Sequence, residues 1–107
     1  MSEFLKDDSE KIRLELIEPS FINGVGQILT FGAQKYGAGN WKQAGPDDIE
    51  RVKGAMLRHQ MAYMGGEIFD LESGFMHMYH ISTNAMFLAY YDEKEYNERA
   101  CTSEEHN

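Results

Sequence analysis

The sequence predicts an all-α protein, a small helical domain of three main helices that follow a short extended N-terminal arm. Two stretches place apolar residues at helical spacing, and a third surrounds a polar stripe with apolar residues. Glycine and proline separate these stretches, as expected where helices end and begin. The 107 residues correspond to a single domain over the whole chain, 1–107, with flexible ends at 1–11 and about 93–107.

The N-terminal arm precedes the first expected helix. Residues 1–11 are polar, and residues 12–17 alternate apolar and polar side chains with a period of two. This period predicts a short extended segment that packs along one face. Pro19 then breaks the segment, and Ser20 is a residue type that commonly caps a helix.

The first helix is expected from about Phe21 to Tyr36, because the apolar residues there follow helical spacing. Those residues are Ile22, Val25, Leu29, Ala33 and Tyr36. Three glycines in the same stretch lower its helix propensity, and close packing on a neighbouring helix explains them better than a ligand does. They are Gly24, Gly26 and Gly32. Glycines at 37 and 39 then end the helix in a turn.

The second helix is expected to begin at Pro46 and to reach about Met64. Proline is well placed in a first helical turn, and the acidic residues that follow it complement the positive end of the helix dipole. Glycines at 65 and 66 stop the helix.

The third helix is expected to begin near Ser73 or Gly74 and to extend past Tyr91. The chain then becomes charged, and residues 100–107 are expected to be disordered. A domain of three short, apolar helices buries little surface alone, so a homodimer or homotetramer is expected.

The charge and hydropathy of the chain exclude some partners. The formal net charge is −8, and residues 19–91 hold six acidic and five basic side chains. No basic stripe exists for a duplex nucleic acid. No apolar run approaches the roughly 20 residues of a membrane span, and the N-terminus lacks the apolar core of a signal peptide. We therefore expect a cytoplasmic protein, and the single Cys101 excludes an intramolecular disulfide.

Three carboxylates lie just ahead of the third helix. They are Glu67, Asp70 and Glu72. Carboxylate oxygens are the ligands that Mg²⁺ prefers, and Mg²⁺ is the usual partner of polyphosphates. Acids in a solvated loop also favour the positive end of a helix, and spacing alone favours this second explanation.

On the third helix, His77, His80 and Asn84 fall within one narrow angular sector. Two histidines one turn apart can bind a transition metal, act as a general base or donate to a phosphate. They can equally be satisfied groups packed between helices, and the pattern alone does not distinguish these possibilities.

The string FGAQKYGAGNW at 31–41 suits a nucleotide. Lys35 could contact a phosphate, Tyr36 and Trp41 offer flat surfaces for a base, and Asn40 could bond a base edge. The alternative is a glycine-assisted helix end with Trp41 in the core.

Midway along the second helix, Arg58 and His59 could contact the substrate. The planar guanidinium of Arg58 can grip a phosphate. Its alternative role is an ordinary ion pair with a loop acid such as Glu67 or Asp70.

Together these strings resemble the phage-encoded dATP/dGTP diphosphohydrolase N-terminal domain family, over about Ile12 to Leu88. The strings are FGAQKYGAGNW at 31–41, LRH at 57–59 and GE-x-x-D-x-ESG-x-x-H-x-x-H-x-x-x-NA-x-FL at 66–88. The resemblance implies hydrolysis of dATP or dGTP to the monophosphate and pyrophosphate. It also implies kinship with the all-α, usually oligomeric MazG-type pyrophosphatases, which depend on Mg²⁺ or Mn²⁺ held by carboxylates.

With this resemblance, each candidate residue has an expected role. The metal would be held by Glu67 and Asp70 with Glu72, and His77 or His80 would act in catalysis. Contacts to the purine nucleotide would come from Lys35, Tyr36, Asn40, Trp41, Arg58, His59 and Asn84.

The chain departs from the MazG-type pattern in one respect. Glu67 and Asp70 match its second acidic pair, but the first expected helix has no acidic residue. The metal set would then need Glu72, a histidine, or acids from another subunit. The alternative function is a non-catalytic protein that sequesters a nucleotide or a nucleotide-derived signal. A structural protein with a buried polar network is a third.

Overall fold

The computed structural model describes residues 10–105 and confirms the all-α prediction. Its elements are the 3-10 turns η1 (Leu14–Leu16) and η2 (Asn40–Gln43) and the helices α1 (Pro19–Tyr36), α2 (Pro46–Met64) and α3 (His77–Glu105). No strand occurs within this described range. None of the described helices combines the length and apolar character that crossing a bilayer requires.

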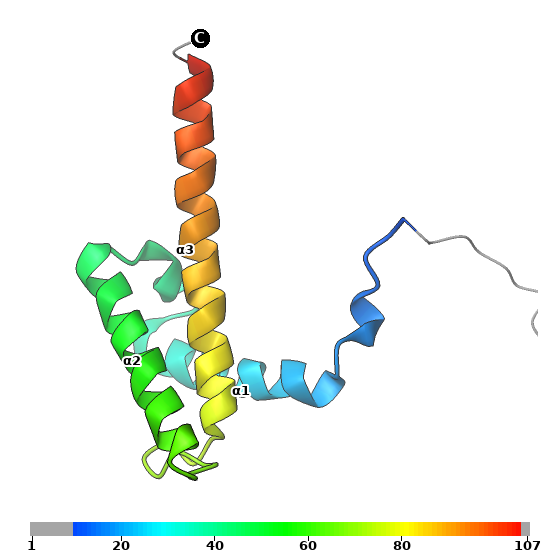
Figure 1. Cartoon of the computed structure of the whole chain (residues 1–107), viewed down its shortest axis with the longest axis vertical. Helices are drawn as coiled ribbons and strands as arrows, with labels where there is room; N and C mark the ends of the chain where they lie inside the picture. Colours follow the sequence, from blue (N-terminus) through cyan, green and yellow to red (C-terminus); the bar gives the residue numbers. More distant parts are fainter. Residues whose placement is uncertain (1–9, 106–107) are drawn as a thin grey trace, which may run out of the picture.

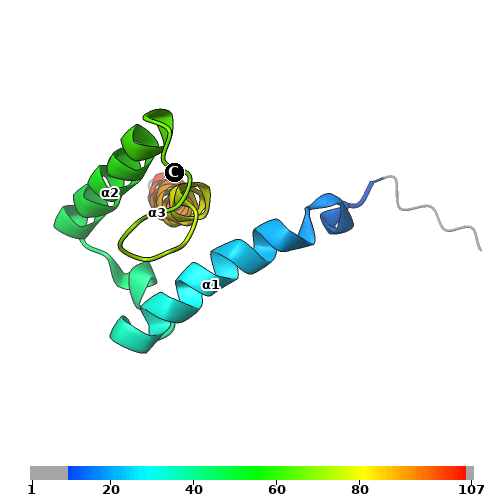
Figure 2. The ribbon, with the colours of Figure 1, turned by 90° about the horizontal axis from the view of Figure 1, so that it is seen from below.

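The three helices do not form a closed bundle. Figures 1 and 2 show α2 beside the first half of α3, whereas α1 runs across this pair and away from it. The C-terminal half of α3 extends beyond the other two helices (Figure 1). The loop that joins α2 to α3 lies at the end of the molecule opposite the C-terminal half of α3, and the candidate site is at this loop.

The N-terminal arm differs from the extended segment predicted over 12–17. Residues Leu14–Leu16 form a 3-10 turn, with hydrogen bonds from the Leu16 amide to the Arg13 carbonyl and from the Ile17 amide to the Leu14 carbonyl. An extended segment needs a neighbour for its backbone groups, and none is present in the described chain. The turn satisfies those groups locally, so the prediction of an extended arm was wrong at these residues.

The boundaries of α1 and α2 follow from their capping groups. Glu18, and not Ser20 as predicted, caps α1, because its carboxylate accepts from the Ser20 amide at 3.2 Å. Gly37 ends α1 with a φ of 91°, a backbone conformation that favours glycine. Helix α2 begins at Pro46 as predicted, and the preceding Gly45 amide donates to the Asp48 carboxylate at 3.0 Å.

Helix α3 begins a few residues later than predicted and extends past Tyr91 as predicted. It begins at His77, because the residues before it form the loop that is described below. At the other end it continues to Glu105, so the prediction of disorder was wrong for residues 100–105. The parts of the predicted flexible ends at 1–9 and 106–107 lie outside the described residues.

The glycines of α1 were predicted to permit close helix packing, and this holds for one of them. A Cβ atom on Gly24 would lie 2.5 Å from the ring of Tyr79 on α3, so only glycine fits this contact. Added Cβ atoms on Gly26 and Gly32 would meet nothing within 4 Å, so the packing explanation is wrong for these two.

The apolar core within the described chain is small. Its centre is Tyr91, which is 9% exposed and donates its hydroxyl proton to the Trp41 carbonyl at 2.6 Å. The Trp41 ring stacks on Phe87, with 4.6 Å between ring centroids. Trp41 therefore joins η2 to α3, which agrees with its alternative role as a packing residue.

Much apolar surface of the arm and of α1 is left uncovered. The exposed fraction is 67% for Leu14, 70% for Leu16 and 56% for Ile22. The radius of gyration is 18.2 Å, whereas a compact chain of this length has about 13 Å. The arm and α1 thus present a face that nothing in the described chain covers.

Candidate functional site

The loop between α2 and α3 brings acidic side chains to the first turn of α3. Its backbone folds back on itself, with hydrogen bonds from the Asp70 amide to the Phe75 carbonyl at 2.8 Å and from the His77 amide to the Ile68 carbonyl at 2.9 Å. Gly66 and Gly74 have φ values of 103° and 80°, which a residue with a Cβ rarely adopts. These turns place Glu67 and Asp70 beside the histidines of α2 and α3.

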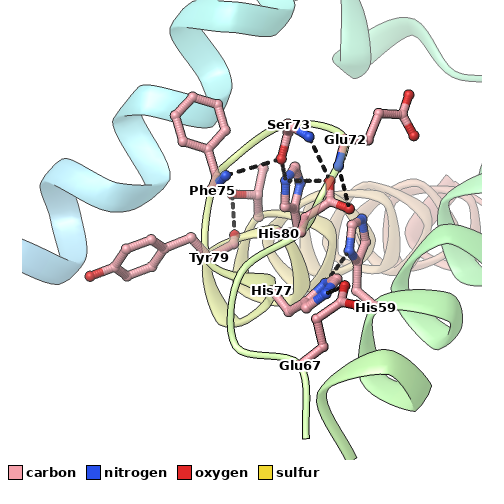
Figure 3. Close-up of polar contacts among 10 residues, drawn as sticks. His59, Glu67, Glu72, Ser73, Phe75, His77, Tyr79 and His80 are labelled. Atoms are coloured by element: carbon pink, nitrogen blue, oxygen red, sulfur yellow. Dashed lines mark hydrogen bonds and ion pairs between the residues drawn. The ribbon is translucent and has the colours of Figure 1, made fainter. Parts of the chain in front are cut away.

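His77 is the centre of the cluster and is only 2% exposed. Its Nε2 atom lies 2.6 Å from Oε1 of Glu67, and its Nδ1 atom lies 2.8 Å from Nδ1 of His59. Figure 3 shows the three side chains pointing toward one another from the loop, α3 and α2. Glu67, His77 and His59 therefore form one continuous chain of polar contacts.

The ionised carboxylate of Glu67 fixes the proton positions along this chain. A carboxylate only accepts, so Nε2 of His77 donates to it. In neutral His77 the Nδ1 atom then carries a lone pair, and Nδ1–H of His59 donates to that lone pair. Burial lowers the pKa of His59 and outweighs the opposing effect of nearby Asp70, which favours this neutral form of His59.

His80 is held by Ser73, a residue that the sequence analysis did not include in the site. The Ser73 Oγ atom lies 2.7 Å from Nε2 of His80 and accepts from the Phe75 amide at 3.2 Å. The Ser73 side chain also forms a hydrogen bond with Asp70. If Ser73 donates its single proton to the Asp70 carboxylate, its oxygen accepts from Nε2–H of His80, and Nδ1 of His80 keeps a lone pair.

The His80 ring stacks on the His59 ring, with 4.2 Å between centroids and 3° between planes. Burial is the largest cause that lowers the pKa of His80, and His59 adds to it. Two stacked imidazoles repel each other when both are charged. The site therefore favours neutral rings, which keep lone pairs available to a proton or a metal ion.

Asp70 is the second carboxylate of the cluster. Burial raises its pKa, but hydrogen bonds from the Ser73 side chain and from the Ser73 and Glu72 amides outweigh burial and lower it. Its Oδ2 atom lies 3.7 Å from Nε2 of His80. Ligand atoms of His59, Asp70 and His77 all lie within 4.8 Å of one another, so this set fits a divalent ion.

Three other predicted residues lie outside this cluster. Glu72 is exposed, and its carboxylate points away from the histidines (Figure 3). Arg58 is exposed and forms no ion pair within residues 10–105, so the predicted pair with Glu67 or Asp70 is absent there. Asn84 is half-buried, and its side chain has no hydrogen-bond partner in the described part of the chain.

The remaining predicted residues line a separate hollow at the end of α1. This hollow has a volume of about 600 Å³ and a largely apolar wall. The predicted residues in its lining are Lys35, Tyr36, Asn40 and Trp41. Phe31 also lines it and makes an edge-on contact with Phe75, next to His80. The structure therefore separates the predicted base-binding residues from the histidine cluster, with two phenylalanines between them.

The fold and the cluster define a class of protein: a small all-α domain whose helix–loop–helix junction holds three histidines and two carboxylates. A family model matches residues 2–100, and the chain belongs to this family, described as dATP/dGTP diphosphohydrolase, N-terminal. The chain is also similar to a dATP/dGTP diphosphohydrolase of Salmonella phage PMBT28, with 36% identity over 84 residues. The matched part is 78% of this chain but 28% of that relative. No solved structure matches the chain.

Proposed function

We propose that this chain takes part in the metal-dependent hydrolysis of a purine deoxynucleoside triphosphate, dATP or dGTP, to the monophosphate and pyrophosphate. The observation that carries this proposal is the cluster of His59, Asp70 and His77, whose ligand atoms lie within 4.8 Å of one another. The family description and the printed name of the phage relative support the substrate class. The match covers 28% of that relative. The hydrolytic activity named for the whole relative is therefore a proposal for this chain.

The metal is proposed to be Mn²⁺ or Mg²⁺, held by the histidine–carboxylate cluster. A divalent ion bound there would neutralise phosphate charge and lower the pKa of a bound water. His80 is the proposed general base, because its lowered pKa keeps the ring neutral near pH 7. Ser73 would orient this ring through the contact of 2.7 Å to Nε2.

The hollow at the end of α1 is the proposed place for the purine. Tyr36 and Asn40 line it and are exposed, so a ring and an amide are available to a base. Trp41 would form part of its wall, because one face of its ring is already stacked on Phe87. Lys35 and Arg58 are the proposed cations for the phosphates, as phosphoryl chemistry requires.

A second candidate function is nucleotide binding without cleavage. It is favoured by one observation: α1 has no acidic residue along Pro19–Tyr36, where the MazG-type pattern places a metal-binding pair. In that case the nucleotide would be bound tightly and released unchanged.

One experiment separates the two functions. The purified chain is incubated with a panel of ribo- and deoxynucleoside triphosphates, with Mn²⁺, with Mg²⁺ and with a chelator, and the products are separated by chromatography. We expect monophosphate and pyrophosphate from purine deoxynucleotides only when a divalent ion is present. Stoichiometric binding with recovery of intact nucleotide would support sequestration and exclude hydrolysis by this chain.

A further inference from the structure

We infer that the cluster is a transition-metal site in which His59, Asp70 and His77 are the ligands, and in which Glu67 acts only by orienting His77. This inference rests on the proposed function in one respect only, the expectation that a divalent ion binds here. The inferred ligands are two nitrogen atoms and a single oxygen atom, whereas the predicted set of Glu67, Asp70 and Glu72 contains only carboxylates.

The assignment of Glu67 follows from its contact with His77. Nε2 of His77 lies 2.6 Å from the Glu67 carboxylate, so this nitrogen is occupied by a hydrogen bond. His77 can then offer a metal only its Nδ1 atom. A metal-bound histidine almost always donates its other ring N–H to a carboxylate or a carbonyl, which fixes the ring and makes it a stronger ligand. Glu67 therefore acts as a positioning residue for the His77 ring.

The assignment of His59 follows from the short contact between the two Nδ1 atoms. They lie 2.8 Å apart and share one proton between two rings. A cation that takes the place of this proton meets both nitrogens, after the His59 proton moves from Nδ1 to Nε2. His59 stays neutral in this exchange, because its ring keeps one proton throughout.

Asp70 supplies the one negative charge of the set. Hydrogen bonds from the Ser73 amide at 3.2 Å and from the Glu72 amide at 3.4 Å hold its carboxylate in place. Glu72 is excluded because its own carboxylate is exposed and points away from the cluster (Figure 3).

The donor set selects the class of metal. Mg²⁺ demands oxygen ligands and is seldom held by imidazole, whereas two imidazoles and a carboxylate suit first-row transition ions. Of the two ions expected for the family, the site therefore favours Mn²⁺ over Mg²⁺. It should also bind Co²⁺, whose visible absorption reports the ligands directly.

The test measures metal binding to the full chain without any nucleotide. The metal-free protein is titrated with Co²⁺ while its visible absorption is recorded, and Mn²⁺ or Mg²⁺ is then added as a competitor. We expect ligand-field bands that a large excess of Mn²⁺ weakens and that the same excess of Mg²⁺ leaves in place, because Mn²⁺ binds nitrogen ligands more weakly than Co²⁺ does. Equal competition by Mg²⁺, or no bands at all, would overturn the inference.

Matched carboxylate variants separate the roles of the three acids. Asp70→Asn should abolish the bands, and Glu67→Gln should weaken Co²⁺ binding by about 10–100-fold, the usual loss when an orienting partner is removed. Glu72→Gln removes the same charge from the same loop and should bind Co²⁺ as the natural chain does. The inference fails if Glu72→Gln weakens binding as much as Glu67→Gln.

A measurement on the natural chain avoids any variant that does not fold. The ¹⁵N resonances of the histidine rings are recorded with and without Zn²⁺. Zn²⁺ should shift Nδ1 of both His59 and His77, whereas Nε2 of His77 should stay protonated toward Glu67. Unmoved Nδ1 resonances would contradict the assignment.

The metal site and the hydrolysis can fail separately. Metal binding as described without pyrophosphate release would leave the site standing and overturn the proposed activity. Pyrophosphate release that requires a divalent ion, from a chain that shows no Co²⁺ bands, would overturn the ligand assignment and leave the proposed activity standing.

Discussion

His77 and Glu67 are joined by a contact of 2.6 Å between a buried imidazole nitrogen and a half-buried carboxylate oxygen. The histidine comes from the first turn of α3 and the glutamate from the start of the loop that follows α2. The contact therefore closes the junction of the two helices, in addition to its proposed role in orienting a metal ligand.

Glu67→Ala should lower the free energy of unfolding, because it leaves Nε2–H of buried His77 without its acceptor. The expected loss is about 1–3 kcal/mol. Glu67→Gln keeps an oxygen acceptor and should lose less. Urea denaturation followed by circular dichroism measures both variants, with Glu72→Ala as the control. That control should stay within about 0.5 kcal/mol of the natural chain, and an equal loss in it would contradict this account of the Glu67 contact.

Gly24→Ala should loosen the packing of α1 on α3. The added Cβ atom would lie 2.5 Å from the ring of Tyr79, and overpacking of this kind destabilises by about 1–3 kcal/mol. Gly26→Ala and Gly32→Ala add the same methyl group to the same helix in open space. Each should instead stabilise the chain by up to about 1 kcal/mol, because alanine has the higher helix propensity. Thermal denaturation compares the three variants, and a loss of the same size in all of them would refute the close contact.

Tyr91→Phe tests the bond that ties η2 to α3. The variant removes the hydroxyl that donates to the Trp41 carbonyl at 2.6 Å and should cost about 0.5–1.5 kcal/mol. The neighbouring Tyr90 also contacts the Trp41 ring, with 5.0 Å between ring centroids. No hydrogen bond of its hydroxyl is found in residues 10–105, so Tyr90→Phe is a suitable control and should be nearly neutral. Chemical denaturation of both variants measures the difference, and equal effects would argue against the bond.

The exposed apolar face of the arm and α1 predicts that copies of this chain associate. Leu16 is 70% exposed and Ile22 is 56% exposed, and burial of such side chains favours association by about 25 cal/mol per Å². Light scattering after size-exclusion chromatography should give a mass of at least twice 12.3 kDa. Leu16→Glu and Ile22→Glu should reduce that mass, whereas Gln27→Glu, on the same helix, serves as a control for added charge. A 12.3 kDa species at all concentrations would contradict the prediction.

The helices could be predicted from the sequence, because spacing, prolines and glycines determine them locally. The start of α2 at Pro46 is an example. The arm could not be predicted, because its alternating pattern indicates a buried face only when something covers that face. Ser20 was predicted as the cap from its residue type, but the carboxylate of Glu18, two residues earlier, accepts from the Ser20 amide and caps the helix.

The candidate site was predicted in part. The helical spacing of His77 and His80 predicted that they lie on one side of the third helix. Because the loop before this helix is short, the sequence also placed Glu67 and Asp70 close to them. The contact between His59 and His77 joins residues 18 positions apart on different helices, and no local pattern indicates it. The role of Ser73 was missed for a related reason, since its hydroxyl meets His80 only after the loop turns at Gly74. Lys35, Tyr36, Asn40 and Trp41 were predicted to contact the same nucleotide as the histidines, and only the packing of α1 shows that they line a separate hollow.

Asp70 and the two histidines beside it are proposed to form a metal-dependent nucleotide hydrolysis site. The most direct measurement is pyrophosphate release from dATP and dGTP in Mn²⁺ by the natural chain, by Asp70→Asn and by Glu72→Gln, after circular dichroism has shown that each is folded. The natural chain and Glu72→Gln should release pyrophosphate at similar rates. Asp70→Asn should be at least about 100-fold slower, because it loses several kcal/mol of transition-state charge stabilisation. Equal rates for folded Asp70→Asn and the natural chain would contradict the claim.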